Sequence, residues 1–126
     1  MEPKPDSAIP AIRVVMMPRD VNAQGSIFGG VLLSLIDQAA FVEALRQSSR
    51  RYVTVAFEGV EFHKPVLVGD VLSLWAKTTR IGRTSVRVHV RVMAQRETVS
   101  SEITVTEADV VLVAVDASGA PIPVGD

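Results

Sequence analysis

Residues 31–47 read VLLSLIDQAAFVEALRQ, and this segment determines which fold the chain can adopt. Its apolar side chains recur at helical spacing and extend almost all the way round the helix. A helix of this kind is expected to be buried rather than half-exposed. Its few polar residues are Ser34, Asp37, Gln38, Glu43 and Arg46. Two glycines, Gly29 and Gly30, stand at its start.

Beyond the helix the hydrophobic period changes to two, which predicts strands. The predicted strands cover residues 53–62, 71–79, 85–93 and 103–115. The alternation slips by one position at Glu58-Gly59, and a glycine at such a slip indicates a β-bulge. Gly82 lies in a predicted hairpin turn at residues 80–83.

The segments before and after this core are expected to be less regular. Residues 12–17 form a short apolar strand that Pro18 ends, and a loop follows as far as Gly30. Residues 1–11 contain three prolines and are expected to form a flexible arm. Residues 12–126 then form a single domain that ends in a turn-rich tail at 119–126.

The order of strand, helix and four antiparallel strands predicts an α+β fold with a five-stranded sheet wrapped round one long helix. One helix cannot cover both faces of such a sheet, and the face that carries Arg87, His89 and Arg91 is expected to meet water or a partner. The edge strands also need protection, which edge-to-edge pairing in a symmetric assembly provides. We therefore expect a homo-oligomer.

Composition excludes several classes of protein. The chain has 126 residues, a net charge of −1, no cysteine and two histidines. A thiol nucleophile and a disulfide framework are excluded, and a histidine-rich zinc site is not expected. We expect no nucleic-acid partner, because the basic footprint is absent. No secretory signal or membrane span is evident, so the cytoplasm is the expected location.

Residues 17–40, MPRDVNAQGSIFGGVLLSLIDQAA, resemble the N-terminal half of hotdog-fold acyl-CoA thioesterases. The match is closest to the bacterial YciA-type and cytosolic acyl-CoA hydrolase branch. Three further segments agree in order and spacing: VTVAFEGVEFHKPVLVGDV (53–71), GRTSVRVHV (82–90) and TEADVVLVAVD (106–116). The resemblance implies a five-stranded antiparallel sheet wrapped round a long helix, the arrangement that the periodicity predicts independently.

Asp37 is the first candidate for chemistry. Its helical neighbours are Leu33, Ser34, Ala40 and Phe41. An aspartate there is a competent general base for a water, or a nucleophile on a thioester carbonyl. From the residues alone, a structural aspartate that caps a neighbouring loop is the favoured interpretation. The resemblance instead implies that Asp37 is the catalytic acidic residue.

The residues before the helix provide further candidates. Asn22 lies in a turn-forming loop, where asparagine commonly bonds its own backbone. The resemblance implies that Asn22 orients the thioester or the water and faces Asp37 of another chain in a composite site. The amides at Gly29 and Gly30 lack intrahelical partners, and the resemblance favours Gly30 as the donor that holds the oxyanion. The alternative is that these glycines serve only the turn or the packing. Phe28 and Gly29 are expected to contact substrate.

Candidate contacts to the CoA part lie in two turns. Lys64 and Arg83 supply cations for phosphates, and the resemblance places Thr84 and Ser85 near the bound nucleotide or pantetheine. A hairpin with solvated basic residues is the alternative. His63 is interpreted as structural.

The predicted activity is hydrolysis of acyl-CoA to a free acid and CoA, without a metal or another cofactor, by a dimer or a trimer of dimers. One alternative is a hotdog hydratase or dehydratase, which has a His and an Asp close together in the site, a pair that the candidate site residues of this chain do not include. Another is a non-catalytic acyl-CoA binder. Acyl chain length and the choice between water activation and a covalent anhydride stay open.

Overall fold

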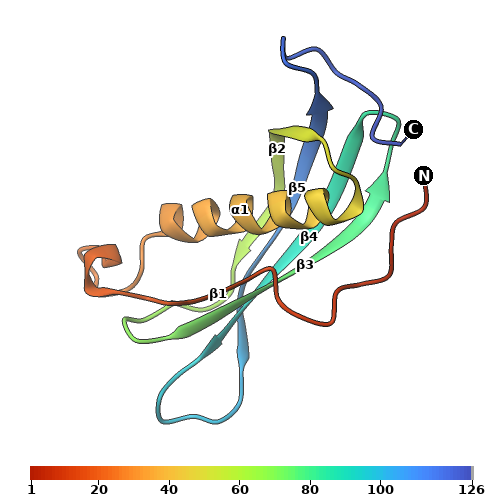
Figure 1. Cartoon of the computed structure of the whole chain (residues 1–126). Helices are drawn as coiled ribbons and strands as arrows, with labels where there is room; N and C mark the ends of the chain where they lie inside the picture. Colours follow the sequence, from red (N-terminus) through yellow and green to blue (C-terminus); the bar gives the residue numbers. More distant parts are fainter. Residues whose placement is uncertain (126) are drawn as a thin grey trace.

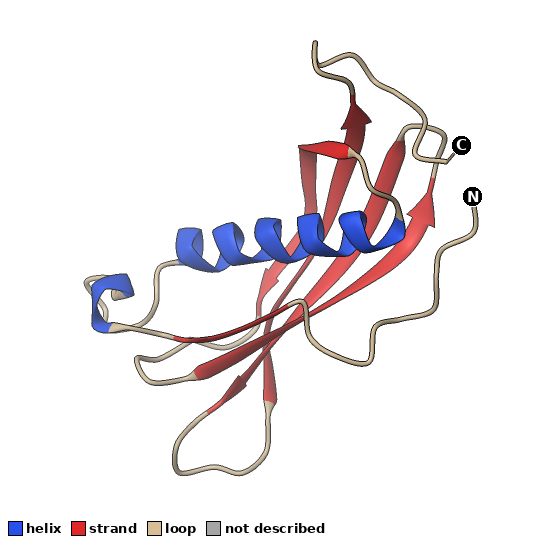
Figure 2. Cartoon of the chain, in the orientation of Figure 1, coloured by secondary structure: helices blue, strands red, loops and turns tan. Residues whose placement is uncertain are grey.

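The computed structural model describes residues 1–125, so Asp126, the last residue of the predicted domain and tail, lies outside the described residues. A strand β1 (Ile12–Val15), a 3-10 turn η1 (Pro18–Asp20) and a helix α1 (Gly29–Gln47) come first. Four strands follow: β2 (Arg51–Phe62), β3 (Val71–Ile81), β4 (Ser85–Gln95) and β5 (Ile103–Val115). They form one antiparallel sheet in the order β1-β3-β4-β5-β2, with α1 across one face (Figures 1 and 2). The predicted fold class is confirmed.

The core lies between α1 and the inner face of the sheet. The helix presents small and aliphatic residues at spacings of three and four, among them Leu32, Ile36, Ala40 and Ala44, all of which are buried. The valines that alternate along β4 face them, and burial of each valine contributes about 1.5–3 kcal/mol. These valines are Val86, Val88, Val90 and Val92. The alternating valines of β4 and the apolar residues of α1 therefore pack together in one core.

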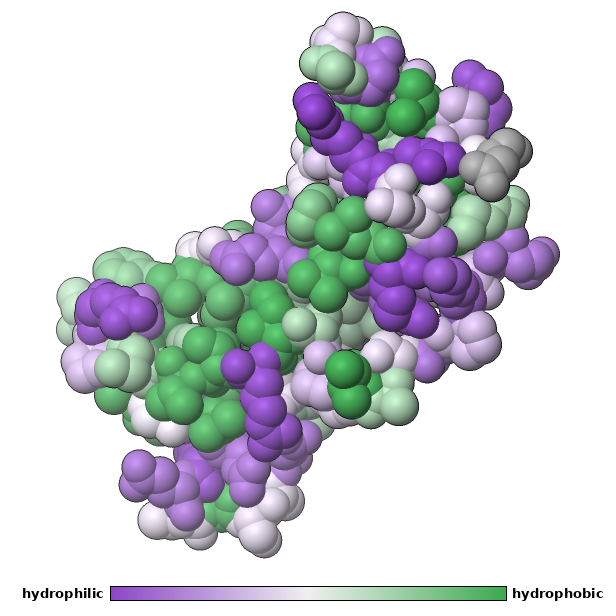
Figure 3. Space-filling view, viewed as in Figure 1, coloured by the Kyte–Doolittle hydropathy of each residue, from purple (hydrophilic) through white to green (hydrophobic). Residues whose placement is uncertain are grey.

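The prediction that the helix is buried all round is wrong for the single chain. The sheet covers one side of α1, and Phe41, Val42 and Leu45 on its other side are each about two-fifths exposed. Hydrophobic residues gather along the side of the molecule on which the helix lies (Figure 3). This exposed helical face and the edge strand β2 form the α1–β2 apolar surface. Its members are Phe41, Val42, Leu45, Val53, Val55 and Phe57.

The predicted bulge in β2 is confirmed. The pairing of β2 with β5 passes from Glu58↔Asp109 to Glu61↔Glu107, so the extra residue lies in between. Gly59 has φ +56, a left-handed conformation that glycine adopts without a steric penalty. A second irregularity between Thr54 and Ala56 was not predicted. Both irregularities change how β2 presents its side chains at the open edge of the sheet.

The outer face of the sheet carries a network of charges. His89 lies between two carboxylates, with Nδ1 3.1 Å from Asp109 and Nε2 3.0 Å from Glu107. His63 Nε2 reaches the other oxygen of Glu107 at 3.0 Å. Hydrogen bonds, first from His89 and then from His63, hold the pKa of Glu107 below its ordinary value. Arg87 bonds Glu58 at 2.7 Å. The polar side chains predicted on one face of β4 thus bond to acidic residues of β5 and β2.

A buried polar cluster joins the C-terminal half of α1 to β3. Glu43 is 2% exposed and accepts hydrogen bonds from Thr78 at 2.6 Å, Arg46 at 2.8 Å and Gln47 at 3.0 Å. Residues 1–11 have no helix or strand and contact the same cluster, since Arg46 donates to the Pro5 carbonyl at 2.9 Å and Gln47 accepts from the Lys4 amide at 2.7 Å.

Candidate active site

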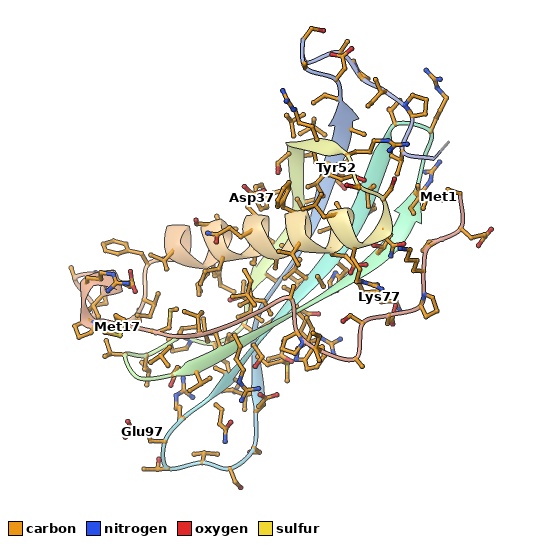
Figure 4. The ribbon with its side chains drawn as sticks, in the orientation of Figure 1. Met1, Met17, Asp37, Tyr52, Lys77 and Glu97 are labelled. Carbon is orange, nitrogen blue, oxygen red and sulfur yellow. The ribbon has the colours of Figure 1, made fainter. Side chains whose placement is uncertain are left out.

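Asp37 lies two turns into α1, on the side of the helix that faces β2 (Figure 4). Its side chain is half-buried, and its Oδ1 accepts a hydrogen bond from the Thr54 hydroxyl at 2.5 Å. Thr54 comes from β2, so the bond spans the helix and the edge strand. The carboxylate is therefore oriented by a fixed neighbour instead of rotating freely.

A cavity of about 540 Å³ opens beside this carboxylate. Its lining is mostly apolar and comes from α1, β2 and β5: Asp37, Gln38, Phe41, Val42, Tyr52, Val53, Thr54 and Leu112. The Tyr52 hydroxyl donates to the Ser48 carbonyl at 2.7 Å, and burial raises the pKa of Tyr52. Asp37 is thus the group in this lining that is suited to accept a proton, and the rest suits an apolar chain.

The start of α1 forms a second part of the candidate site. Phe28 is the N-cap but its side chain caps nothing, and it is 52% exposed. The backbone bonds of the first turn begin with the amides of Val31 and Leu32, both of which reach the Phe28 carbonyl. The amides of Gly29 and Gly30 precede them and have no acceptor within the helix.

The two glycines differ in their surroundings. A Cβ at Gly29 would lie 3.3 Å from Cζ of the exposed Phe62 ring, a tight contact that requires the ring to shift slightly. A Cβ at Gly30 would meet no atom within 4 Å. Space for a ligand to approach the backbone therefore exists at Gly30. Beside Gly29 lies a cavity of about 300 Å³, whose lining includes Phe62, His63 and Lys64.

Asn22 closes its own loop. Its Oδ1 accepts hydrogen bonds from the amides of Gln24 at 2.9 Å and Ser26 at 3.1 Å, and its Nδ2 donates to the Ser26 hydroxyl at 3.1 Å. This is the structural role that asparagine has in turns. Within one chain, Asn22 does not line the cavity beside Asp37.

The candidate CoA contacts lie at opposite ends of the sheet. Lys64 lines the cavity beside Gly29, at the end where β3 begins. Arg83, Thr84 and Ser85 follow the other end of β3, which has 11 residues and is therefore roughly 35 Å long. There Arg83 and Thr84 bind the C-terminal strand and tail through their carbonyls. One chain does not bring these residues to the same place.

Thr54 is the neighbour of Asp37 that the sequence did not reveal. It lies 17 residues from Asp37 in the chain. The alternating pattern of its strand explains a polar residue at this position, so nothing in the sequence marked it as a site residue. Another cavity, of about 430 Å³, lies on the outer face of the sheet beside Trp75, His89 and Arg91 and contains none of the predicted site residues.

Among residues 1–125, no group of three or more histidines and carboxylates is arranged to hold a metal ion. In the same part of the chain, no helix has the length and the apolar character that crossing a membrane requires.

Comparison with known proteins identifies the family of this chain. The chain belongs to the thioesterase superfamily, whose family model matches residues 24–101. This match confirms the family resemblance of residues 17–40.

Individual relatives agree with that family. An uncharacterized acyl-CoA thioester hydrolase of Zymomonas mobilis is 45% identical over 104 residues, which cover 79% of this chain and 70% of the relative. The acyl-CoA thioester hydrolase YciA of Salmonella typhimurium is 38% identical, over 89% of this chain and 86% of the relative. A hexameric hotdog-fold thioesterase of Campylobacter jejuni superimposes with a TM-score of 0.88 at 40% identity, over 94% and 91% of the two chains.

Proposed function

We propose that this chain hydrolyses acyl-CoA thioesters to the free acid and CoA. The observation that carries the proposal is the Asp37 carboxylate, oriented by Thr54 at the edge of an apolar cavity in a chain of the thioesterase superfamily. Relatives that match most of this chain are named acyl-CoA thioester hydrolases. An acid beside an apolar space suits a substrate with a reactive carbonyl and an aliphatic chain.

In the proposed reaction, Asp37 accepts a proton from a water molecule that attacks the thioester carbonyl. Thr54 occupies Oδ1, which leaves Oδ2 to bind the water. The Gly30 amide donates to the carbonyl oxygen and stabilises the negative charge of the tetrahedral intermediate. The C–S bond then breaks, CoA leaves as the thiolate, and Asp37 gives its proton to that thiolate.

Direct attack by Asp37, which passes through a mixed anhydride, needs the same groups. The position of the water oxygen separates the two routes when water opens the anhydride at the Asp37 carboxyl carbon. A single turnover in ¹⁸O-labelled water puts the label in the product acid when Asp37 acts as a base. Label in the Asp37 side chain identifies the anhydride route.

The spacing of Gly30 and Asp37 supports a site made by two chains. Seven residues of helix rise about 10 Å, which is too far for both groups of one helix to reach one carbonyl carbon. We therefore place Asp37 of one protomer opposite Gly30 and Asn22 of its partner. The α1–β2 apolar surface and the unpaired edge of β2 suit such a two-fold contact.

A dimer is the proposed unit, and a trimer of dimers is compatible with the hexameric thioesterase of Campylobacter jejuni. Residues far apart in one chain could then meet at one CoA molecule, and we propose phosphate or pantetheine contacts for Lys64, Arg83, Thr84 and Ser85. Phe28 and Gly29 would lie against the thioester. A cytoplasmic location remains a prediction.

The test is thiol release from a panel of CoA esters of different acyl length, compared between the wild type and Asp37→Asn. We expect at least a hundredfold loss of kcat in Asp37→Asn with binding of the ester retained, whereas Asp6→Asn in the exposed arm keeps wild-type rates. A wild type that binds CoA esters without releasing thiol would instead be an acyl-CoA binder. Hydration of an enoyl-CoA without thiol release would indicate a hydratase.

A further inference from the structure

The turn between β2 and β3, residues 63–70, forms a wall of the cavity at the start of α1. Pro65 and Val66 line this cavity together with Gly29. Val66 is buried, and its carbonyl accepts a hydrogen bond from the Ile27 amide at 2.8 Å. Ile27 precedes the first residue of α1 by two positions. The place of the turn therefore determines where the helix begins.

Asp70 holds this turn in shape. It is 2% exposed, and its Oδ2 accepts a hydrogen bond from the Leu67 amide at 2.9 Å. The backbone of the turn is tied to the end of β1, because Met16 donates to the Asp70 carbonyl and accepts from the Gly69 amide, both at 2.9 Å. A carboxylate that is buried to this extent is stable only when it is paired.

Arg96 supplies that pairing from the connection between β4 and β5. Its Nε lies 3.3 Å from Asp70 Oδ1, and its Nη2 donates to the Pro65 carbonyl at 2.9 Å. One planar guanidinium therefore contacts both the beginning and the end of the turn. A lysine ammonium, which is a point charge, cannot satisfy both positions with the same geometry.

We propose that Arg96 is a positioning residue for hydrolysis. By bracing the turn through Pro65 and Asp70, it fixes the Val66–Ile27 hydrogen bond and hence the direction of the Gly30 N–H. This inference rests on the proposed function and adds a residue that was not among the predicted site residues. A misplaced oxyanion donor slows the chemical step more than it weakens substrate binding.

The kinetic test compares Arg96→Gln and Arg96→Lys with the wild type on a CoA ester that the wild type hydrolyses. We expect kcat to fall at least about tenfold in Arg96→Gln, with KM within about threefold, and Arg96→Lys to lie between the two. Arg91→Gln is the matched control, because it removes an arginine that contacts Glu107 on the outer face of the sheet and not the turn. It is expected to keep the wild-type kcat.

Hydrogen exchange gives a readout that does not depend on activity. Amides 27–31 should exchange faster in Arg96→Gln, while those of β4 and of the C-terminal half of α1 keep their wild-type protection. A merely structural role would raise exchange throughout and leave the kcat of the folded fraction unchanged, and that result overturns the proposal. Wild-type kcat together with wild-type exchange at 27–31 overturns it as well.

If Arg96→Gln does not fold, Arg96→Lys alone tests the proposal. Lysine keeps the charge beside Asp70 but loses the bond to Pro65, so wild-type values in this variant contradict the proposal. A wild type that hydrolyses no CoA ester would refute the proposed function, whereas wild-type kcat and wild-type exchange at residues 27–31 in an Arg96 variant of an active enzyme would refute only the role of Arg96.

Discussion

Glu43 is the buried charge on which the C-terminal half of α1 depends. Burial raises the pKa of Glu43, but hydrogen bonds from Arg46, Thr78 and Gln47 outweigh that effect and hold the pKa below its ordinary value. A lowered carboxyl pKa stabilises the fold above the pKa of the unfolded chain, and that contribution is lost as the pH falls through the folded-state pKa.

We predict that Glu43→Gln lowers the free energy of unfolding by about 1–3 kcal/mol at pH 7, because hydrogen bonds to a charged acceptor are replaced by weaker ones. Thermal melts at pH 7, 5 and 4 check this. The stability difference between variant and wild type should shrink as the pH falls, since the wild type loses its carboxylate there. Glu102→Gln at an exposed position is the control, and a difference that does not change with pH would contradict the assignment.

Individual site residues were predictable to different degrees. Asp37 stood out because a polar residue within an apolar helix is unusual and because its surrounding motif resembled a known family. Its partner Thr54 could not be found, since their contact depends on how the edge of the sheet meets the helix. Asn22 carried two interpretations, and its hydrogen bonds show the structural one, while its catalytic role stays a prediction.

The first turn of α1 is the element whose chemistry can be tested without disturbing the fold. We predict that Gly30→Ala folds normally and gains up to about 1 kcal/mol of stability, because alanine favours helix and the added Cβ meets no neighbouring atom. Its kcat/KM should fall by roughly 10- to 100-fold, since the methyl group occupies the space needed by a substrate carbonyl. Melting temperature and steady-state kinetics on the same sample measure both effects.

Ser34→Ala, one turn further along the exposed face of α1, is the control for Gly30→Ala. It changes the surface of the helix without touching the amides of the first turn. Full activity in Gly30→Ala would show that the space at this glycine is not used by substrate.

Strands and the helix were predictable as elements because hydrophobic period depends on the sequence alone. The valines of β4 and the phase slip at Gly59 gave the strand and the bulge correctly. The exposure of α1 was not predictable in this way. The hydrophobic pattern predicts that a residue such as Phe41 is buried. It does not indicate whether the same chain or another chain buries it.

At the scale of the whole molecule, the α1–β2 apolar surface predicts how the chain assembles. Val55 is 57% exposed at the open edge of β2. We predict that Val55→Lys gives a monomer in light scattering and loses turnover as it dissociates, because a charged edge strand resists pairing and Asp37 then lacks its partner's Gly30. Val99→Lys places the same charge at another exposed valine, 44% exposed in the connection between β4 and β5, and should stay assembled and active. A fully active Val55→Lys monomer would place the complete site within one chain.

The proposed two-chain site, inferred from the seven-residue interval between Gly30 and Asp37, has a consequence for the cell. A site that is split between two copies exists only after they have met, so at low abundance its output rises more steeply than the amount of chain present. Doubling expression would then more than double the thioester consumed. Because assembly through the unpaired edge of β2 would complete the site, metabolic flux through this reaction would be sensitive to gene dosage.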